Sequence, residues 1–174
     1  MIATTRRTFA ISMLAVLAAC GRPAPQPSKF QRYSGPPITQ VQINKGQRRM
    51  HLFSGGTVVK SYDISLGNQP VGHKQFSGDG KTPEGVYFID RFNPRSAYHL
   101  SVGISYPNVR DRAFAESYGQ DPGGDIFIHG RGPQGNNLFP QARDWTAGCI
   151  AVTDEEIQEI YAMLQPGVAV VIYP

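Results

Sequence analysis

The protein has 174 residues, of which 40% are hydrophobic and 17% are charged, and its formal net charge is +4. This mildly basic balance, without a cluster of lysine and arginine interleaved with aromatic residues, disfavours a nucleic-acid-binding protein. Residues 38–174 are enough for one domain with a hydrophobic core and too few for two.

The first 19 residues have the pattern of a secretory signal peptide. Arg6 and Arg7 precede an apolar run at residues 9–19, and no acidic residue occurs among them. The run is shorter than the about 20 residues that a membrane-spanning helix needs, which disfavours a permanent anchor. The two arginines resemble a twin-arginine export signal, and the general secretory pathway is the alternative. We therefore expect export to the periplasm, after which the net charge falls to +2.

Residues 17–20, with the sequence LAAC, resemble a bacterial lipobox, in which Cys20 receives a lipid after cleavage. The alternative is an ordinary cleavage site with an incidental cysteine. Lipidation is favoured because an exposed, unpaired thiol is a liability in an oxidising compartment. The proline-rich residues 20–37 then form a tether of roughly 50 Å, with a leader without function as the alternative. Gly21 resembles the residue that follows the cysteine in outer-membrane lipoproteins, so we expect that membrane rather than the inner one.

Seven short apolar or alternating runs follow, separated by glycine, proline and asparagine, and they predict strands of a mainly β domain. The last run has the near-continuous apolar character of a buried central strand. The predicted strands lie within residues 38–44, 48–54, 57–67, 84–92, 98–107, 123–130 and 168–174.

Two short helices are predicted between these strands. The first spans residues 108–119, between a candidate asparagine cap and a glycine. The second spans residues 154–164, where Thr153 and Glu156 form a capping box and apolar residues recur at i, i+3, i+4 and i+7. The fold class expected from these patterns is mainly β with one or two short helices.

Cys149 has no evident disulfide partner, because the only other cysteine is Cys20. His129 ends a predicted strand 20 residues upstream, next to a glycine. Such a pair suits nucleophilic catalysis: the histidine removes the thiol proton, an imidazolium lowers the thiol pKa, and the proton later goes to a leaving amine. Backbone amides near Gly148 and Cys149 are candidates for an oxyanion hole. The alternative is a buried apolar cysteine and a core histidine, and spacing alone does not decide between them.

The segment IHG at residues 128–130, a variable loop and TAGCI at residues 146–150 resemble the catalytic signature of the L,D-transpeptidase (YkuD-type) family. The stretches at residues 65–87 and 99–108 resemble the same family, so the likeness covers residues 38–174. It implies a β-sandwich-like catalytic domain that acts on peptidoglycan stem peptides without a metal or other cofactor.

The resemblance also assigns roles to residues of this chain. Cys149 would be the nucleophile and His129 the base, with the histidine oriented by a backbone carbonyl. The thiolate would attack the carbonyl at the L-centre of the third residue of a tetrapeptide stem, releasing D-alanine and forming a thioester that an amine resolves. Gly148 would contribute to the oxyanion hole, and Gly130 and Thr146 are candidate substrate-binding residues.

Two positions depart from the common family pattern. Ala147 stands where many members have histidine, and Ala151 stands where they have arginine or asparagine. The missing arginine removes a carboxylate contact, so other donors must bind the substrate. In this the chain resembles the YafK-like branch, for which hydrolysis, including release of wall-bound protein, is considered beside transfer. Transpeptidation, hydrolysis and a non-enzymatic peptidoglycan-binding lipoprotein all stay open.

The remaining histidines are kept outside the catalytic set. His73 lies in a glycine-rich loop and His99 opens a predicted strand, and hydrogen bonding within the fold is at least as good an interpretation for each. No compact spacing typical of zinc sites occurs, so we expect no metal site. The segment at residues 78–85 lacks the spacing of a phosphate loop and predicts turns. The sequence does not indicate an oligomeric state.

Overall fold

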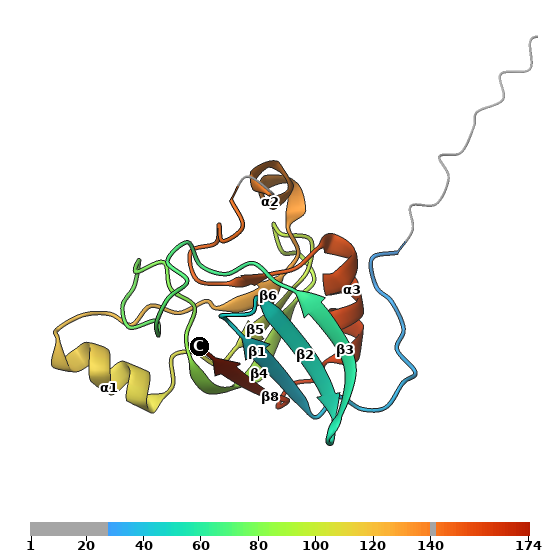
Figure 1. Ribbon diagram of the computed structural model, residues 1–174, viewed down its shortest axis with the longest axis horizontal. Helices are drawn as coiled ribbons and strands as arrows, with labels where there is room; N and C mark the ends of the chain where they lie inside the picture. Colours follow the sequence, from blue (N-terminus) through green and yellow to red (C-terminus); the bar gives the residue numbers. More distant parts are fainter. Residues whose placement is uncertain (1–27, 140–141) are drawn as a thin grey trace, which may run out of the picture.

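The structure, a computed structural model, describes residues 28–139 and 142–174. The predicted signal segment and the predicted lipidation site at Cys20 lie outside these residues. The described part of the chain forms eight strands and three short helices. Figure 1 shows how these elements are arranged.

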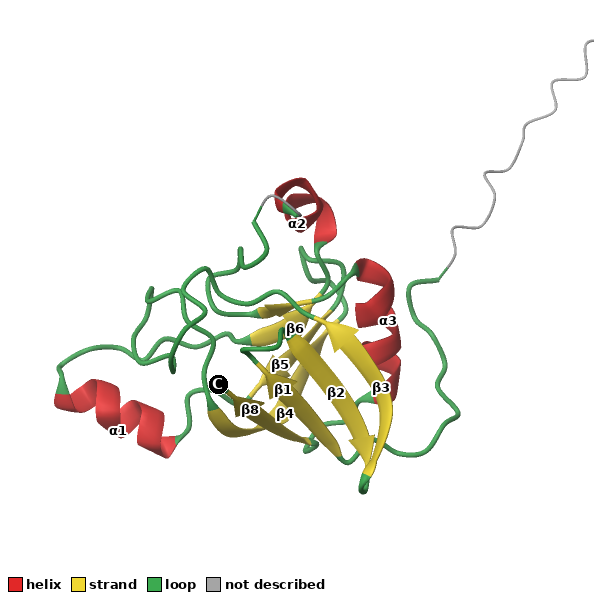
Figure 2. Ribbon diagram, viewed as in Figure 1, coloured by secondary structure: helices red, strands yellow, loops and turns green. Residues whose placement is uncertain are grey.

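The eight strands make one curled sheet in the order β3-β2-β1-β8-β4-β5-β6-β7 (Figures 1 and 2). Neighbouring strands are antiparallel except for the parallel pairs β1–β8 and β6–β7. The mainly β prediction is confirmed, and the last strand, β8, is central as expected, between β1 and β4. The bounds are β1 Gln40–Asn44, β2 Arg49–Ser54, β3 Thr57–Asp63, β4 Gly85–Asn93, β5 Ser101–Ile104, β6 Phe127–His129, β7 Ile150–Ala151 and β8 Ala169–Tyr173.

Alternation along the strands builds the core on one face of the sheet. In β1 and β8 every second residue is buried, and the register pairs Val41 with Val170 and Ile43 with Ile172. These paired side chains form rows across the sheet, because residues two apart in a strand share a face. Burying each such side chain contributes roughly 1.5–3 kcal/mol, which favours this register over a slip by one residue.

Helices α1 (Val109–Ser117) and α3 (Asp154–Met163) lie where the sequence predicts them. The capping box of Thr153 and Glu156 begins α3, and at the start of α1 the Asn108 side chain accepts hydrogen bonds from two backbone amides. Helix α3 packs on β5 and β6, with its apolar stripe in the core (Figure 2). No helix in the described part of the chain has the length and apolar character needed to cross a membrane.

Two elements were not predicted. Helix α2 (Gly132–Leu138) forms within a stretch whose glycine, proline and asparagine content predicts a loop. Strand β7 has only two residues, and it exists because it pairs with β6 on one side and forms a bridge from Ala151 to Ser65 on the other. Both elements flank the segment that carries Cys149, and both depend on packing rather than on local sequence.

Residues at the end of the predicted tether lie against the domain on the α3 side (Figure 1). The Lys29 ammonium group donates to the carbonyl oxygens of Pro94 and His99, at 2.6 and 3.1 Å. The Phe30 ring lies 6.1 Å from the ring of Tyr161. The described part of the predicted tether is therefore in contact with the folded domain.

Candidate active site

The sheet brings His129 and Cys149 to neighbouring strands. His129 is the last residue of β6 and pairs with Ala151 of the parallel strand β7, while Cys149 directly precedes β7. Residues two apart along a strand share a face, so Cys149 and His129 lie on one side of the sheet, with Cα atoms about 8 Å apart. The opposite face carries Ile128 and Ile150, both fully buried in the core.

The Cys149 side chain is half-buried and lies across the start of β6. Its sulfur donates to the carbonyl oxygen of Asp125 and accepts the amide hydrogen of Phe127, each at 3.4 Å. Burial raises the pKa of the Cys149 thiol; the Phe127 amide opposes that shift and the Asp125 carboxylate adds to it. In this conformation the sulfur is therefore a neutral thiol whose proton is held by a backbone carbonyl.

The His129 ring is held in one tautomer. Its Nδ1 atom lies 2.6 Å from the carbonyl oxygen of Gly130, which can only accept, so Nδ1 carries the hydrogen and Nε2 is left as the acceptor. The rings of Tyr98 and Trp145 lie 4.5 and 5.8 Å from it, and the side chain is 3% exposed. This burial lowers the pKa of His129, so the ring is a neutral base at neutral pH.

These protonation states differ from the ion pair expected from the sequence. The expected imidazolium would lower the thiol pKa, yet burial pushes the pKa of Cys149 up and the pKa of His129 down. Both shifts have one cause, because a low-dielectric site disfavours the charged form of each group. The resting pair is therefore neutral, and the thiol must lose its proton before or during attack on a substrate.

Thr146 fixes the backbone around the nucleophile. Its hydroxyl donates to the carbonyl oxygen of Cys149 at 2.7 Å and accepts the Gly148 amide hydrogen at 3.1 Å. Gly148 has φ +135°, and a Cβ atom there would lie 2.6 Å from the Lys81 carbonyl oxygen, so only glycine fits. Thr146 is itself buried, which makes it a brace for this turn in the present conformation.

The two candidate oxyanion donors differ in availability. The Gly148 amide is occupied by Thr146, whereas the Cys149 amide has no hydrogen-bond partner within residues 28–139 and 142–174. The assignment of Gly148 to the oxyanion hole stays a prediction, and the geometry adds the Cys149 amide as the donor that is free.

Gly130 lies behind the histidine rather than in an open groove. It is buried, and a Cβ atom at this position would meet the Tyr98 carbonyl oxygen at 2.9 Å and the Asp154 carboxylate even closer. The Asp154 carboxylate also accepts the Gly132 amide hydrogen at 2.8 Å, which joins α3 to the start of α2. The local role of Gly130 is thus close packing and presentation of its carbonyl to His129, while its predicted contact with substrate stays a prediction.

His73 and His99 hydrogen bond within the fold. His73 contacts the Asp111 carboxylate at 3.1 Å through Nε2 and accepts the Glu84 amide hydrogen through Nδ1. The Nε2 atom of His99 lies 2.9 Å from the Gln158 amide nitrogen. In the described part of the chain, no group of three histidine, cysteine or carboxylate side chains is arranged to hold a metal ion.

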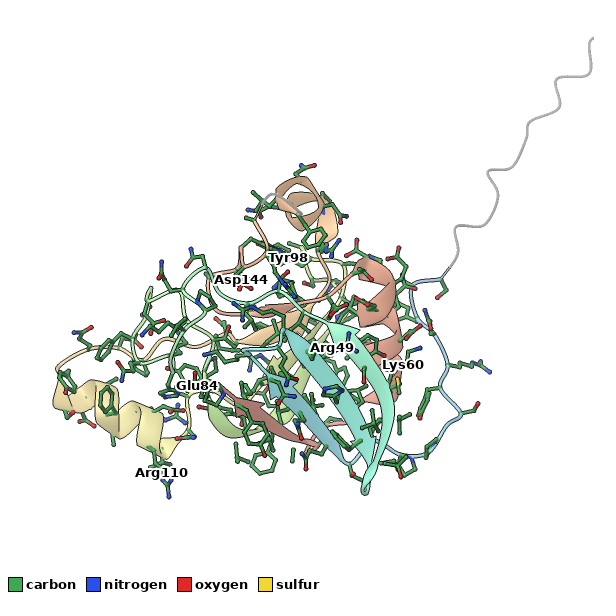
Figure 3. All side chains as sticks on the ribbon, viewed as in Figure 1. Arg49, Lys60, Glu84, Tyr98, Arg110 and Asp144 are labelled. Carbon is green, nitrogen blue, oxygen red and sulfur yellow. The ribbon has the colours of Figure 1, made fainter. Side chains whose placement is uncertain are left out.

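Sequence reasoning missed the side chains that support the site. Asp144 forms a salt bridge with Arg48 at 2.7 Å and accepts the Leu66 amide hydrogen at 3.0 Å, which fastens the chain just before Thr146. Tyr98 covers the His129 ring, and Figure 3 shows Tyr98 and Asp144 at the end of the sheet beneath α2. The only sequence signal for Asp144 is its place two residues before the TAGC motif.

Comparison with known protein families identifies the family of this chain. The model of the L,D-transpeptidase catalytic domain (YkuD) matches residues 38–172. The chain therefore belongs to the L,D-transpeptidase (YkuD) family, as the sequence motifs suggested.

A curated relative and two solved structures illustrate the likeness. "Putative L,D-transpeptidase YafK" of Escherichia coli strain K12 is 29% identical over 178 residues, covering 94% of this chain and 65% of that protein. The helical cell shape determining protein Pgp2 of Campylobacter jejuni is 27% identical, with TM-score 0.59, over 80% of this chain and 49% of Pgp2. An L,D-transpeptidase of Xylanimonas cellulosilytica, 15% identical with TM-score 0.51, shares the fold over 82% of this chain and 63% of its own. The chain thus spans half to two thirds of the length of these proteins.

Proposed function

We propose that this protein is a peptidoglycan-modifying cysteine enzyme, an L,D-transpeptidase that acts on tetrapeptide stems through a thioester on Cys149. The observation that carries the proposal is the His129 ring, which is locked by the Gly130 carbonyl with Nε2 free, on the strand next to the thiol. A neutral base and a protonated thiol are the protonation states from which general-base activation starts, and the thiol must leave the Asp125 carbonyl to reach Nε2.

In the proposed first step, the sulfur attacks the carbonyl at the L-centre of the third residue while Nε2 of His129 takes the thiol proton. The oxyanion of the tetrahedral intermediate accepts a hydrogen bond from the free Cys149 amide. The intermediate then collapses, and His129 returns the proton to the nitrogen of the leaving D-alanine. The products of this step are a Cys149 thioester and free D-alanine.

In the proposed second step, the amine of an acceptor stem peptide attacks the thioester carbonyl. His129 removes a proton from the amine, the carbon–sulfur bond breaks, and the Cys149 sulfur recovers a proton. Transfer to an amine gives a cross-link, an exchanged amino acid or an attached protein, whereas attack by water gives hydrolysis. The first outcome is our proposal, since the family to which the chain belongs is defined by transfer.

The proposed setting is the periplasm. The twin arginines and the LAAC segment support export and attachment of a lipid to Cys20, at the outer membrane rather than the inner one. Labelling cells with a radioactive fatty acid tests this, because the label should enter the wild-type chain and not the Cys20→Ala variant.

The test of the proposed reaction uses purified protein and tetrapeptide muropeptides, with and without an added acceptor amine, analysed by mass spectrometry. Cross-linked or exchanged products that require both the acceptor and Cys149 support transpeptidation. Shortened peptides alone, formed equally without the acceptor, identify a hydrolase. Unchanged muropeptides that nevertheless bind the protein would instead identify a peptidoglycan-binding lipoprotein.

A further inference from the structure

A pocket is lined by residues of the segment that carries Cys149 and of the neighbouring chain. Its volume is about 350 Å³, and its lining includes Ala151, Ser65, Arg131 and Arg143. The rest of its lining comes from Asp63, Ile64 and Phe139. Ala151 pairs with His129 across the sheet and is two residues from Cys149, so the Cα atom of this lining residue lies about 7 Å from that of Cys149.

The two arginines give this pocket an uncompensated positive charge. Neither Arg131 nor Arg143 forms a salt bridge with a carboxylate of the described residues. The one acidic residue in the lining, Asp63, has a side chain that is 77% exposed and pairs with Arg49 at 3.0 Å. A guanidinium group without a protein partner at the wall of a pocket is suited to an anionic ligand, and to a carboxylate in particular.

The arginine at the pocket wall is also held in place. The Arg131 guanidinium lies 3.6 Å from the centre of the Phe139 ring, which fixes the direction of its planar donors. Position 151 itself contributes only a methyl group to the lining of the pocket. The absence of an arginine from position 151 is therefore matched by two arginines from the segment that carries α2.

We propose that Arg131 and Arg143 bind the side-chain carboxylate of the third residue of the acyl donor, a diamino diacid. This assignment rests on the proposed function, because it takes the attacked carbonyl to lie at Cys149. In such a residue about six bonds separate that carbonyl from the distal carboxylate, or roughly 7 Å when extended. This length is similar to the backbone distance from Cys149 to Ala151 in the pocket lining. The arginines thus select a donor stem whose distal carboxyl is free.

The test compares two synthetic tetrapeptide donors that differ only in whether this carboxyl is free or amidated. With full-length protein, Arg143→Gln should raise KM for the free acid about tenfold or more and change kcat little, since a charged hydrogen bond is lost. For the amidated donor the same variant should match the wild type. Arg131→Lys, which keeps the charge, should lie between the wild type and Arg143→Gln on the free acid.

Controls separate this site from other causes. Arg110→Gln, on helix α1 at the far end of the molecule (Figure 3), should behave as wild type with both donors. If Arg143→Gln raised KM equally for both donors, the segment would merely be disturbed. If it raised KM for neither donor, the pocket would hold no carboxylate. Either outcome overturns the assignment. The assignment would also be overturned if amidating a different carboxyl of the stem, with the distal carboxyl left free, abolished the difference between the wild type and Arg143→Gln.

The carboxylate-binding role of the pocket can be tested even if the proposed reaction does not occur. If the wild type gives no Cys149-dependent product, calorimetric binding of the free-acid donor to Cys149→Ala still tests the pocket. Adding Arg143→Gln to Cys149→Ala should then weaken binding of the free acid by about tenfold and leave binding of the amidated donor unchanged. Equal affinities of the two proteins for the free acid would reject the subsite on its own.

Discussion

Replacing Thr146 by valine keeps the shape of the side chain and removes one hydroxyl. That hydroxyl joins the Cys149 carbonyl to the Gly148 amide, at 2.7 and 3.1 Å, in a buried turn. Each buried partner left without a hydrogen bond costs about 1–3 kcal/mol, so Thr146→Val should lower the free energy of unfolding by about 3 kcal/mol. Thr146→Ser keeps the hydroxyl and loses only a methyl group, so it should lower the free energy of unfolding by only about 1 kcal/mol.

Urea unfolding measures both variants against the wild type. With a slope of about 1–3 kcal/mol per molar urea, the midpoint of Thr146→Val should fall by about 1–3 M. The Val variant should also lose most of its turnover of tetrapeptide under native conditions, because the Cys149 backbone is no longer fixed, while the Ser variant keeps it. A midpoint for Thr146→Val within the error of the wild type, or equal losses in Val and Ser, would refute the role of this hydroxyl.

Two further predictions concern ionisation. Burial raises the pKa of the Cys149 thiol, so alkylation by iodoacetamide should reach half its maximal rate above the ordinary thiol range of about 8.5, and His129→Ala should not shift the midpoint upward. A wild-type midpoint near pH 6 that rises in His129→Ala would contradict the neutral pair and support the ion pair expected from the sequence. Burial lowers the pKa of His129, so the stability it contributes is complete above its ordinary pKa of about 6.5 and is lost as pH falls through the lower folded value. Urea unfolding at pH 7.5 and pH 5 should show a smaller loss for His129→Asn than for the wild type, and equal losses would contradict this assignment.

The strands and two of the helices could be predicted because their signals are local. The short run at residues 38–44, the near-continuous apolar run at residues 168–174 and the capping box of Thr153 indicate β1, β8 and α3 from neighbouring residues alone. Strand β7 could not be predicted in this way, since its two residues are extended only through pairing with β6 and Ser65. Helix α2 was missed because Gly132 and Pro133 read as a turn, while the fold packs Gly135 against Trp145.

The candidate site shows the same division. The motifs pointed to Cys149 and His129 as a pair, and the parallel strands β6 and β7 bring them to one face of the sheet. The direction of their pKa shifts was wrong in the sequence-based expectation, because burial is a property of the folded chain and is absent from a motif. The positive pocket at Ala151 was also hidden, since its arginines come from 20 and 8 residues upstream of that position.

The central claim is that the Cys149 sulfur becomes the acyl carrier, and intact-protein mass spectrometry tests it most directly. After brief mixing with a tetrapeptide donor and acid quenching, the wild type should carry a hydroxylamine-sensitive adduct with the mass of the donor less D-alanine. The adduct should map to Cys149, be absent from Cys149→Ala and form much more slowly in His129→Asn. Turnover of the donor by Cys149→Ala at the wild-type rate, without any adduct on the wild type, would contradict the account.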